Sequence, residues 1–411
     1  MEKNKVFGNT LMLYLMTFAS LTLPLLTLPY LTRVLTKEAY ATVAYVKSSM
    51  TYIQLIVDFG FILSAVKDIS SAGGDRERIG KITGNTILAK LILSAFALGA
   101  LFVLCSTIEI LRSNLTYVIL SFLAVAITAF LADFLFRGIE RMHYVAVIYV
   151  ASKSISTALT FFLVRGEGDV LWIPTLDIFG NVIAVIISFC VIKRLGIRIC
   201  FTGFSDSFAL MRNSLVYFLS SIATTAFSAL NTLLIGIFMS DDVSGVANWN
   251  VCLTIISAIQ SLYAPISNGI YPHMIRERSL KFIHKVLAIF MPIVAIGCAV
   301  SFIFSRVALI IVGGEEYAEA ESLFRLMIPI LFFSFPAQIY GWPTLGAIGK
   351  AKENTASTVV AAAVQVVGIA ALIVLGKFTL VNLAVLRTVT EAALMLIRMW
   401  LVYKNKRLFR L

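Results

Sequence analysis

The sequence predicts an all-α integral membrane protein with about twelve membrane-spanning helices. Hydrophobic residues make up 59% of the 411-residue chain and only 14% of the residues are charged, whereas a soluble domain has roughly 45–50% apolar and about 25% charged residues. The polar residues are too few to cover the surface of a soluble protein of this size. The remaining surface must therefore face lipid.

Apolar runs of the length that a membrane-crossing helix needs, roughly 20 residues, recur along the whole chain. These runs do not alternate between polar and apolar residues as barrel strands do, so helices are predicted. The predicted spans are residues 8–32, 42–66, 83–104, 116–136, 145–164, 170–192, 213–239, 246–270, 286–305, 322–345, 355–375 and 379–403.

The distribution of basic residues predicts the orientation. Most of the Lys and Arg residues outside the predicted spans fall in one set of alternate loops and at both termini, and loops rich in these residues stay on the cytoplasmic side. Both termini of this multi-pass membrane protein are therefore predicted to be cytoplasmic. The net charge of +12 then suits anionic lipid headgroups and does not indicate a nucleic-acid partner.

The stretch 193–212 divides the predicted spans into two sets of six. We therefore expect an N-terminal six-helix lobe (1–192), a cytoplasmic linker (193–212) and a C-terminal six-helix lobe (213–411). An even number of spans in each lobe gives both lobes the same orientation, as in parallel transporter repeats. A short internal echo, Asn9-Thr10 and Asn213-Ser214 at the two lobe starts, favours such a repeat.

Several charged residues lie inside the predicted spans, where each costs about 2.5–3.5 kcal/mol on insertion scales unless it finds water or a partner. Arg325 and Arg398 are near span ends and are expected to reach headgroups. Asp133 is one helical turn from Arg137, which indicates an interfacial pair. The deeper residues are the basic Lys47, Lys90, Lys153 and Arg387 and the acidic Asp58, Asp177 and Glu391.

These deep charges allow two interpretations. Because basic residues outnumber acidic ones, they predict a hydrated, mildly cationic cavity that binds an anionic solute such as a phosphate through Lys47, Lys90, Lys153 and Arg387. Alternatively, buried pairs such as Lys153 with Asp177 only hold helices together, and Arg387 with Glu391, one turn apart, is either a structural pair or a working site. The scattered His and Cys residues predict no metal site, and no catalytic or nucleotide-binding motif is visible.

Prolines within the spans predict kinks, because each removes a backbone hydrogen bond. Transporters use such kinks as hinges, although proline is also ordinary in membrane helices. They occur in the first span and through the second half, at Pro24, Pro29, Pro265, Pro292, Pro329, Pro336 and Pro343.

At these residues the chain resembles the polysaccharide-transporter branch of the multidrug/oligosaccharidyl-lipid/polysaccharide (MOP) superfamily, and most closely the Wzx-type O-antigen or capsule repeat-unit flippases. Glycine, common in that family after the first matching segment, is replaced here by Ala41. The matching segments are 29–40 (PYLTRVLTKEAY), 58–61 (DFGF), 136–142 (FRGIERM) and Asn231 with 235–236 (IG) before 240–242 (SDD).

The resemblance implies two six-helix bundles around a central cavity that opens alternately to either side. Its expected substrate is an undecaprenyl-pyrophosphate-linked oligosaccharide, with the polyprenyl tail left in membrane lipid, and a polysaccharide polymerase and a chain-length regulator are expected partners. No cofactor is expected. Coupling to a proton or sodium gradient is expected at Asp58, Asp177 or Glu391, the deep acids.

Two other functions stay open at this stage. A multidrug exporter of the same superfamily would carry organic cations, and the excess of deep lysines disfavours it. An integral membrane polymerase or ligase acting on lipid-linked sugars is an enzyme, which needs an external loop that carries catalytic groups. Every external loop here is short, so a non-enzymatic transporter is preferred.

Overall fold

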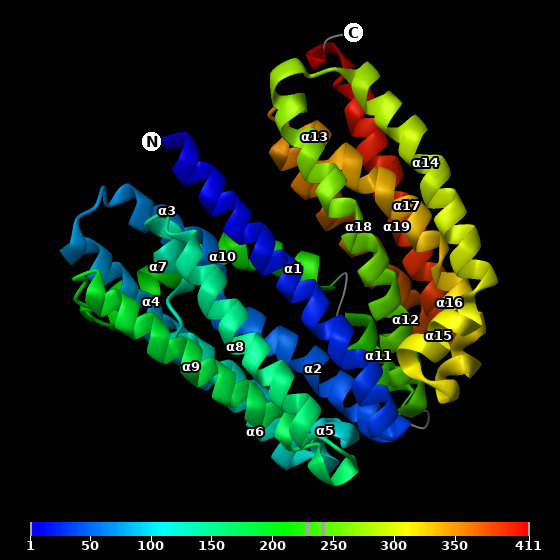
Figure 1. Cartoon of the computed structure of the whole chain (residues 1–411), viewed down its shortest axis with the longest axis horizontal. Helices are drawn as coiled ribbons and strands as arrows, with labels where there is room; N and C mark the ends of the chain where they lie inside the picture. Colours follow the sequence, from blue (N-terminus) through cyan, green and yellow to red (C-terminus); the bar gives the residue numbers. More distant parts are fainter. Residues whose placement is uncertain (1, 227–229, 240–242, 410–411) are drawn as a thin grey trace. The chain divides into compact units, whose positions relative to one another are not determined.

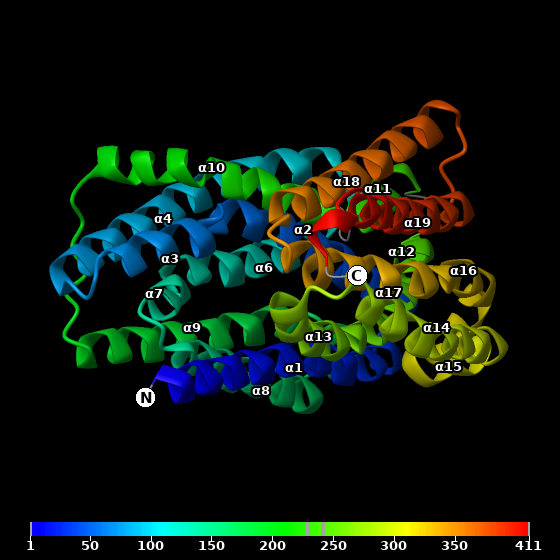
Figure 2. The ribbon, with the colours of Figure 1, turned by 90° about the horizontal axis from the view of Figure 1, so that it is seen from above.

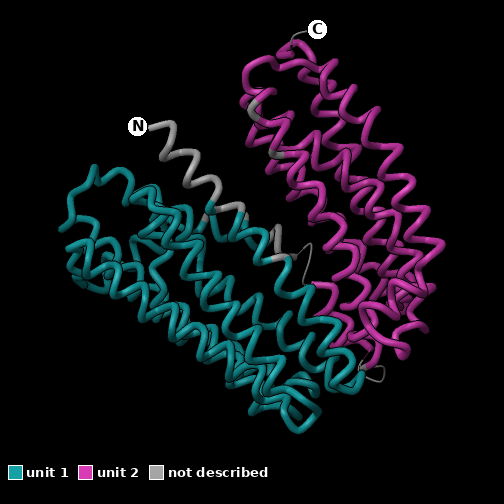
Figure 3. The backbone as a smooth tube through the Cα atoms, in the orientation of Figure 1, with its two compact units in different colours: residues 1–222 teal, residues 223–411 magenta. Residues whose placement is uncertain are grey.

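The computed structural model describes residues 2–226, 230–239 and 243–409, and within these ranges the chain forms helices and no β-strand (Figure 1). The chain divides into two compact units, residues 1–222 and 223–411 (Figure 3). The two units are described separately.

The first unit is built from long helices with short breaks. In chain order it contains α1 (Glu2–Val34), α2 (Lys37–Asp58), α3 (Phe61–Ser71), α4 (Arg76–Thr107), α5 (Glu109–Ser113), α6 (Leu115–Ile127), η1 (Thr128–Phe130), α7 (Asp133–Gly138), α8 (Met142–Leu163), η2 (Glu167–Asp169), α9 (Trp172–Arg194) and most of α10 (Phe204–Ala226).

The second unit follows the same pattern. It contains α11 (Leu230–Phe238), α12 (Val243–Ser261), α13 (Tyr263–Glu277), α14 (Leu280–Ile303), α15 (Ser305–Gly313), η3 (Glu315–Ala320), α16 (Glu321–Met327), α17 (Pro329–Ile339), the π-helical η4 (Tyr340–Gly346), α18 (Ala351–Val374), α19 (Leu380–Lys404) and η5 (Lys406–Leu408).

Most of the predicted spans are present as helices. Within the described residues, 10 helices are long and apolar enough to cross a membrane, and the pair Glu315–Met327 and Pro329–Gly346, bent by 44°, makes 11. The remaining predicted span, 213–239, crosses residues 227–229, which lie outside the described part of the chain. The prediction of an all-helical, multi-pass membrane protein is confirmed.

The packing of the first unit brings helices from distant parts of the chain together. Helix α1 packs along α8, α8 along α9, and α9 along α6, while α2 contacts both α4 and α6 (Figure 1). Consequently, side chains from α2, α6, α8 and α9 face a common interior, although these helices are far apart in the sequence.

The second predicted span is broken where α10 passes it. Helix α2 ends at Phe59, whose φ is 41°, and Gly60 follows with a φ of 77°. A Cβ atom on Gly60 would lie 2.7 Å from Cβ of Tyr217 and 2.9 Å from the backbone nitrogen of Phe218. The ring of Phe59 stacks on that of Phe218, with centroids 4.3 Å apart. The break therefore requires glycine both for its φ and for the close approach of α10.

The predicted linker differs from its expected form, because part of it is helical and the rest is attached to α4. Residues 204–212 belong to α10, which lies beside α4 (Figure 2). The Cys200 amide donates to the Gly80 carbonyl at 3.2 Å, and the amide of Asn85 donates to the Thr202 hydroxyl at 2.6 Å. Gly80 and Gly84, spaced as small residues are at close helix contacts, leave room for the backbone of this segment.

A bend in the second unit follows from prolines inside the 322–345 span. Pro343 has no N–H to donate to the Ile339 carbonyl, and the Thr344 hydroxyl donates to that carbonyl instead, at 2.7 Å. The segment forms the π-helical turn η4, in which Gly341 leaves helical geometry with a ψ of −120°. The bend is therefore stabilised by side-chain hydrogen bonds to the opened backbone.

The geometry at Gly60 gives a stability prediction. Gly60→Ala should destabilise the protein, because a left-handed φ costs a non-glycine residue about 1–2 kcal/mol and overpacking adds about 1–3 kcal/mol. The midpoint of thermal unfolding in detergent measures this loss. Gly99→Ala in α4 is the matched control, because a Cβ atom there meets nothing within 4 Å; equal midpoints for the two variants would contradict the assigned role of Gly60.

Candidate functional site

A cavity of about 620 Å³ lies inside the first unit. Side chains from α1, α2, α6, α7, α8 and α9 line it, among them Lys47, Lys153 and Asp177. Three of the predicted site residues are thus brought together around one space. Charged groups in a membrane-spanning bundle need such a water-accessible space.

Two of these residues form an ion pair between neighbouring helices. The Lys153 ammonium on α8 lies 2.7 Å from a carboxylate oxygen of Asp177 on α9. The two side chains are 35% and 43% exposed, so the pair borders the cavity and is not sealed in the helix contact. The pairing that we considered as an alternative is therefore present, but in a position where a solute can reach both partners.

Lys47 on α2 differs from Lys153 and Arg137, the other cations that line this cavity, because these two form ion pairs. Its side chain is exposed to the cavity, and no carboxylate of the described residues lies within ion-pair distance of its ammonium. Its charge interacts electrostatically with both Asp177 and Lys153. An anion entering the cavity would meet Lys47 without having to displace a carboxylate first.

A second ion pair lines the same cavity near its α7 end. Arg137 lies 3.6 Å from Asp133, one helical turn away, as the sequence predicted. A carboxylate oxygen of Asp133 also accepts a hydrogen bond from the Phe134 amide at 2.9 Å. With Lys47, Lys153 and Arg137 against Asp133 and Asp177, the described lining carries more positive than negative charge.

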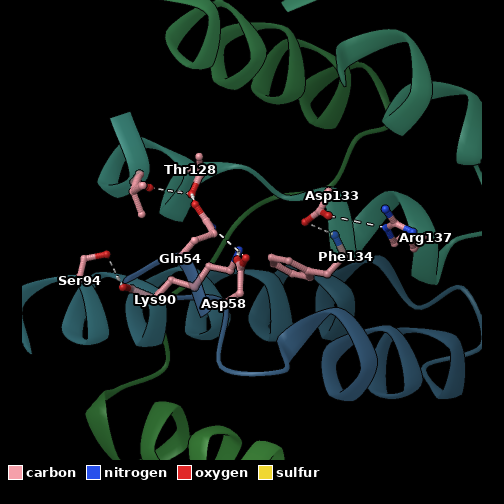
Figure 4. Close-up of polar contacts among 9 residues, drawn as sticks. Gln54, Asp58, Lys90, Ser94, Thr128, Asp133, Phe134 and Arg137 are labelled. Atoms are coloured by element: carbon pink, nitrogen blue, oxygen red, sulfur yellow. Dashed lines mark hydrogen bonds and ion pairs between the residues drawn. The ribbon is translucent and has the colours of Figure 1, made fainter. Parts of the chain in front are cut away.

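Lys90 and Asp58 lie behind this lining in a hydrogen-bonded network (Figure 4). The Lys90 ammonium on α4 is 2.9 Å from Asp58, and the two side chains are 2% and 29% exposed. Gln54, which does line the cavity, donates to Asp58 at 2.8 Å and to the Thr128 hydroxyl at 3.1 Å. We expected Lys90 to face the substrate; instead, its charge is neutralised by Asp58 at the α2 break and it packs over the Phe134 ring.

The second unit contains a separate cavity of about 570 Å³. Glu391 on α19 lines it and forms an ion pair with Arg387 at 2.9 Å, one helical turn earlier. These side chains are only 6% and 8% exposed. The structure therefore places Arg387 in the second unit and in a tight buried pair, whereas Lys47 and Lys153 line the cavity of the first unit.

The prediction that Arg398 reaches the lipid headgroups is wrong. Its guanidinium donates to the Ala337 carbonyl at 2.8 Å, to Ser357 at 3.1 Å and to Thr358 at 3.0 Å, and it lines the second cavity. The α17–η4 bend offers a carbonyl acceptor that the sequence does not reveal. Arg325 instead pairs with Glu321 at 2.7 Å.

A buried polar network in the second unit includes Asn231, one of the residues that resemble the polysaccharide transporters. Gln365 on α18 donates to Asn231 on α11 at 3.0 Å, and Thr390 on α19 donates to Gln365 at 2.6 Å. These two hydrogen bonds join three helices of the second unit, with Gln365 in the middle. The neighbouring residues 240–242 of the same segment lie outside the described residues.

Sequence reasoning missed Gln54 and Arg398 as site residues. Gln54 is uncharged and therefore carried no insertion penalty that would single it out, and Arg398 is close enough to a span end to suggest a headgroup contact.

Among the described residues no group of three metal-ligating side chains comes together.

Helix bundles that enclose charged cavities are typical of multi-pass membrane transporters, and a solved transporter structure has a similar fold. A solved inward-facing structure of a multidrug resistance MATE family transporter of the MOP superfamily matches with a TM-score of 0.70 and 13% identity, covering 96% of this chain and 95% of that one. At this identity the match shows a common fold.

The particular family follows from the sequence. The chain belongs to the polysaccharide biosynthesis protein family, which matches residues 6–277. Proteins named "Putative O-antigen transporter" from Shigella dysenteriae and Escherichia coli (strain K12) are 28% and 27% identical to it, over 80% and 81% of this chain and 82% and 81% of their own length. The resemblance to the polysaccharide-transporter branch is confirmed, and these relatives support a transporter role.

The Arg387–Glu391 pair gives a second prediction. Arg387→Ala and Glu391→Ala should each lower the free energy of unfolding by about 3–5 kcal/mol, because each leaves a buried charge without its ion-pair partner. The double variant should lose less than either single variant. Unfolding by sodium dodecyl sulfate in mixed micelles measures all three. Additive losses would show that the two side chains contribute separately.

Proposed function

We propose that this protein is a flippase that moves a polyprenyl-pyrophosphate-linked oligosaccharide repeat unit across the bacterial cytoplasmic membrane. The supporting observation is the cavity of the first unit, in which Lys47 has no ion-pair partner among the described residues and two further ion pairs stand beside it. Sugars and phosphates do not dissolve in hydrocarbon, so their transfer requires a polar path.

In this proposal Lys47 makes the first contact with the pyrophosphate. An ammonium is a compact charge with three donors, and charge-assisted hydrogen bonds to phosphate are about twice as strong as neutral ones. Lys153 and Arg137 can join when a phosphate oxygen competes with Asp177 or Asp133. The polyprenyl tail stays in lipid. Alternating access to the two sides of the membrane and cytoplasmic termini complete the proposal.

The acidic partners supply a route for energy coupling. If Asp177 binds a proton or a sodium ion, its carboxylate no longer holds the Lys153 ammonium, and Lys153 becomes available to the phosphate. Asp58 with Lys90 and Glu391 with Arg387 have the same arrangement but are more buried. A polysaccharide polymerase, which would consume the translocated unit, and a chain-length regulator are the proposed partners.

The relatives named O-antigen transporters support this substrate class. The solved multidrug transporters share the fold, but an organic cation would have to enter a first-unit cavity whose described charges are mainly positive. The excess of positive charge therefore favours an anionic lipid-linked substrate over a cationic drug.

Lys47→Ala should slow translocation of the lipid-linked unit about tenfold or more. A hydrogen bond to a charged group contributes about 1.5–3 kcal/mol, and 1.4 kcal/mol corresponds to a factor of ten. Lys47→Arg should retain most of the rate because it keeps the charge. Transfer of a fluorescent lipid-linked oligosaccharide in proteoliposomes measures the rates.

The control for this experiment is Lys81→Ala, which removes a solvent-exposed lysine paired with Glu77 on the same unit. It should transport at the wild-type rate. Normal transport by both Lys47→Ala and Lys153→Ala would disprove the cationic-cavity mechanism.

Coupling at Asp177 gives a separate prediction. Asp177→Asn has no carboxylate to release and should transport at the same rate with and without an imposed proton or sodium gradient. The wild type should be accelerated by one of the two gradients. Full acceleration of the Asn variant would exclude Asp177 as the coupling residue. Asp169→Asn, which alters a loop carboxylate that accepts from the Arg165 amide, is the control.

A further inference from the structure

We propose that the cavity of the second unit is a saccharide subsite in which the indole of Trp342 stacks on a sugar ring. This inference rests on the proposed function, because it assigns the glycan part of the same substrate to a place distinct from the phosphate-binding lysines. It is carried by three features of the cavity: its uncharged polar lining, the state of its charges and the position of Trp342.

The lining is rich in neutral hydrogen-bonding groups. The side-chain amides of Gln260 and Gln338 and the hydroxyls of Ser267 and Ser334 all face the cavity. Neither amide has a hydrogen-bond partner elsewhere in the described structure, whereas Ser334 donates to the Leu331 carbonyl and keeps its oxygen free to accept. Each amide offers two donors and one acceptor carbonyl. Such groups match the hydroxyls of a sugar, and they are costly in an apolar bundle without a polar ligand or water.

The charged groups that line this cavity already interact with other groups of the protein. Glu391 is held by Arg387, and the Nε and both terminal nitrogens of Arg398 donate to Ser357, Ala337 and Thr358. Neither a phosphate nor an organic cation would find an uncommitted opposite charge among these groups. The cavity is therefore suited to a neutral, polyhydroxylated ligand, in contrast to the lysine-lined cavity of the first unit.

Trp342 supplies the flat surface that sugar recognition needs. It lines the cavity and is 56% exposed, although it belongs to the π-helical turn η4, a type of distortion that is frequent at functional sites. A Cβ atom on Gly346 would lie 2.8 Å from Cε3 of Trp342, so the ring rests against a residue without a side chain. An indole combines an apolar face, which fits the C–H face of a pyranose, with an N–H donor.

Binding of a free glycan tests the subsite without the phosphate. The probe is the oligosaccharide released by mild acid from the surface polysaccharide of the source strain, and saturation-transfer NMR on the full-length protein in nanodiscs measures its binding. Wild type should bind. Trp342→Ala should reduce the signal at least tenfold and Trp342→Phe should retain about a third of it or more, because a benzene ring still stacks. Gly346→Ala should weaken binding by displacing the indole.

The matched control is Trp400→Ala, which removes another exposed tryptophan of the same unit that packs with Lys404 outside the cavity. This control should bind as the wild type does. Wild-type binding by Trp342→Ala, absence of binding by the wild type, or displacement of the probe by tetraphenylphosphonium would each overturn the proposal.

A translocation assay on the same proteins separates this inference from the proposed function. If wild type moves the lipid-linked unit but Trp342→Ala moves and binds glycan equally well, the saccharide subsite is wrong and the flippase function stands. If wild type binds the glycan at Trp342 but does not move the lipid-linked unit, the flippase function is wrong. Slower transport by Trp342→Ala, with normal transport by Trp400→Ala, supports both.

Discussion

A charge inside a membrane-spanning helix bundle must be paired or hydrated, and this constraint organises the protein. The insertion penalty of an isolated charge is several kcal/mol, so each deep lysine or arginine fixes either a partner or a water-accessible space. Lys90 takes Asp58 as its partner where α2 breaks, and Arg387 takes Glu391 one turn along α19. Lys153 and Lys47 instead border a cavity. The division between structural and accessible charges therefore follows from burial.

The two units meet this constraint with different chemistry. The first unit retains cations that a solute can reach, and its cavity carries more positive than negative charge among the described groups. In the second unit Glu391 is paired with Arg387, and Arg398 donates to the Ala337 carbonyl at the η4 bend. The other polar groups that line this cavity include amides, hydroxyls and an indole. A substrate with an anionic head and a neutral polar chain contains both kinds of group.

The fold class could be predicted from the sequence because hydrophobic length is a local property. Most of the runs that predicted membrane spans reappear as helices, although several are divided by a break such as the one at Gly60. The Asp133–Arg137 and Arg387–Glu391 pairs follow directly from one-turn spacing. What failed depended on tertiary contacts. The partner of Lys90 lies at a helix break that only the approach of α10 explains, and Arg398 binds a carbonyl exposed by a bend. Neither Gln54 nor Trp342 carries an energetic penalty that would mark it in the sequence.

The α17–η4 bend has a consequence for how this part of the protein can evolve. Arg398 fits because Gly341 has no side chain, since a Cβ there would lie 2.9 Å from the guanidinium, and Thr344 replaces the donor that Pro343 removes. A side chain at position 341 alone would clash with the guanidinium, and loss of the Thr344 hydroxyl alone would remove a donor to the Ile339 carbonyl. In related chains the glycine, proline, threonine and arginine should accordingly be inherited together or be replaced together by residues that restore a regular helix.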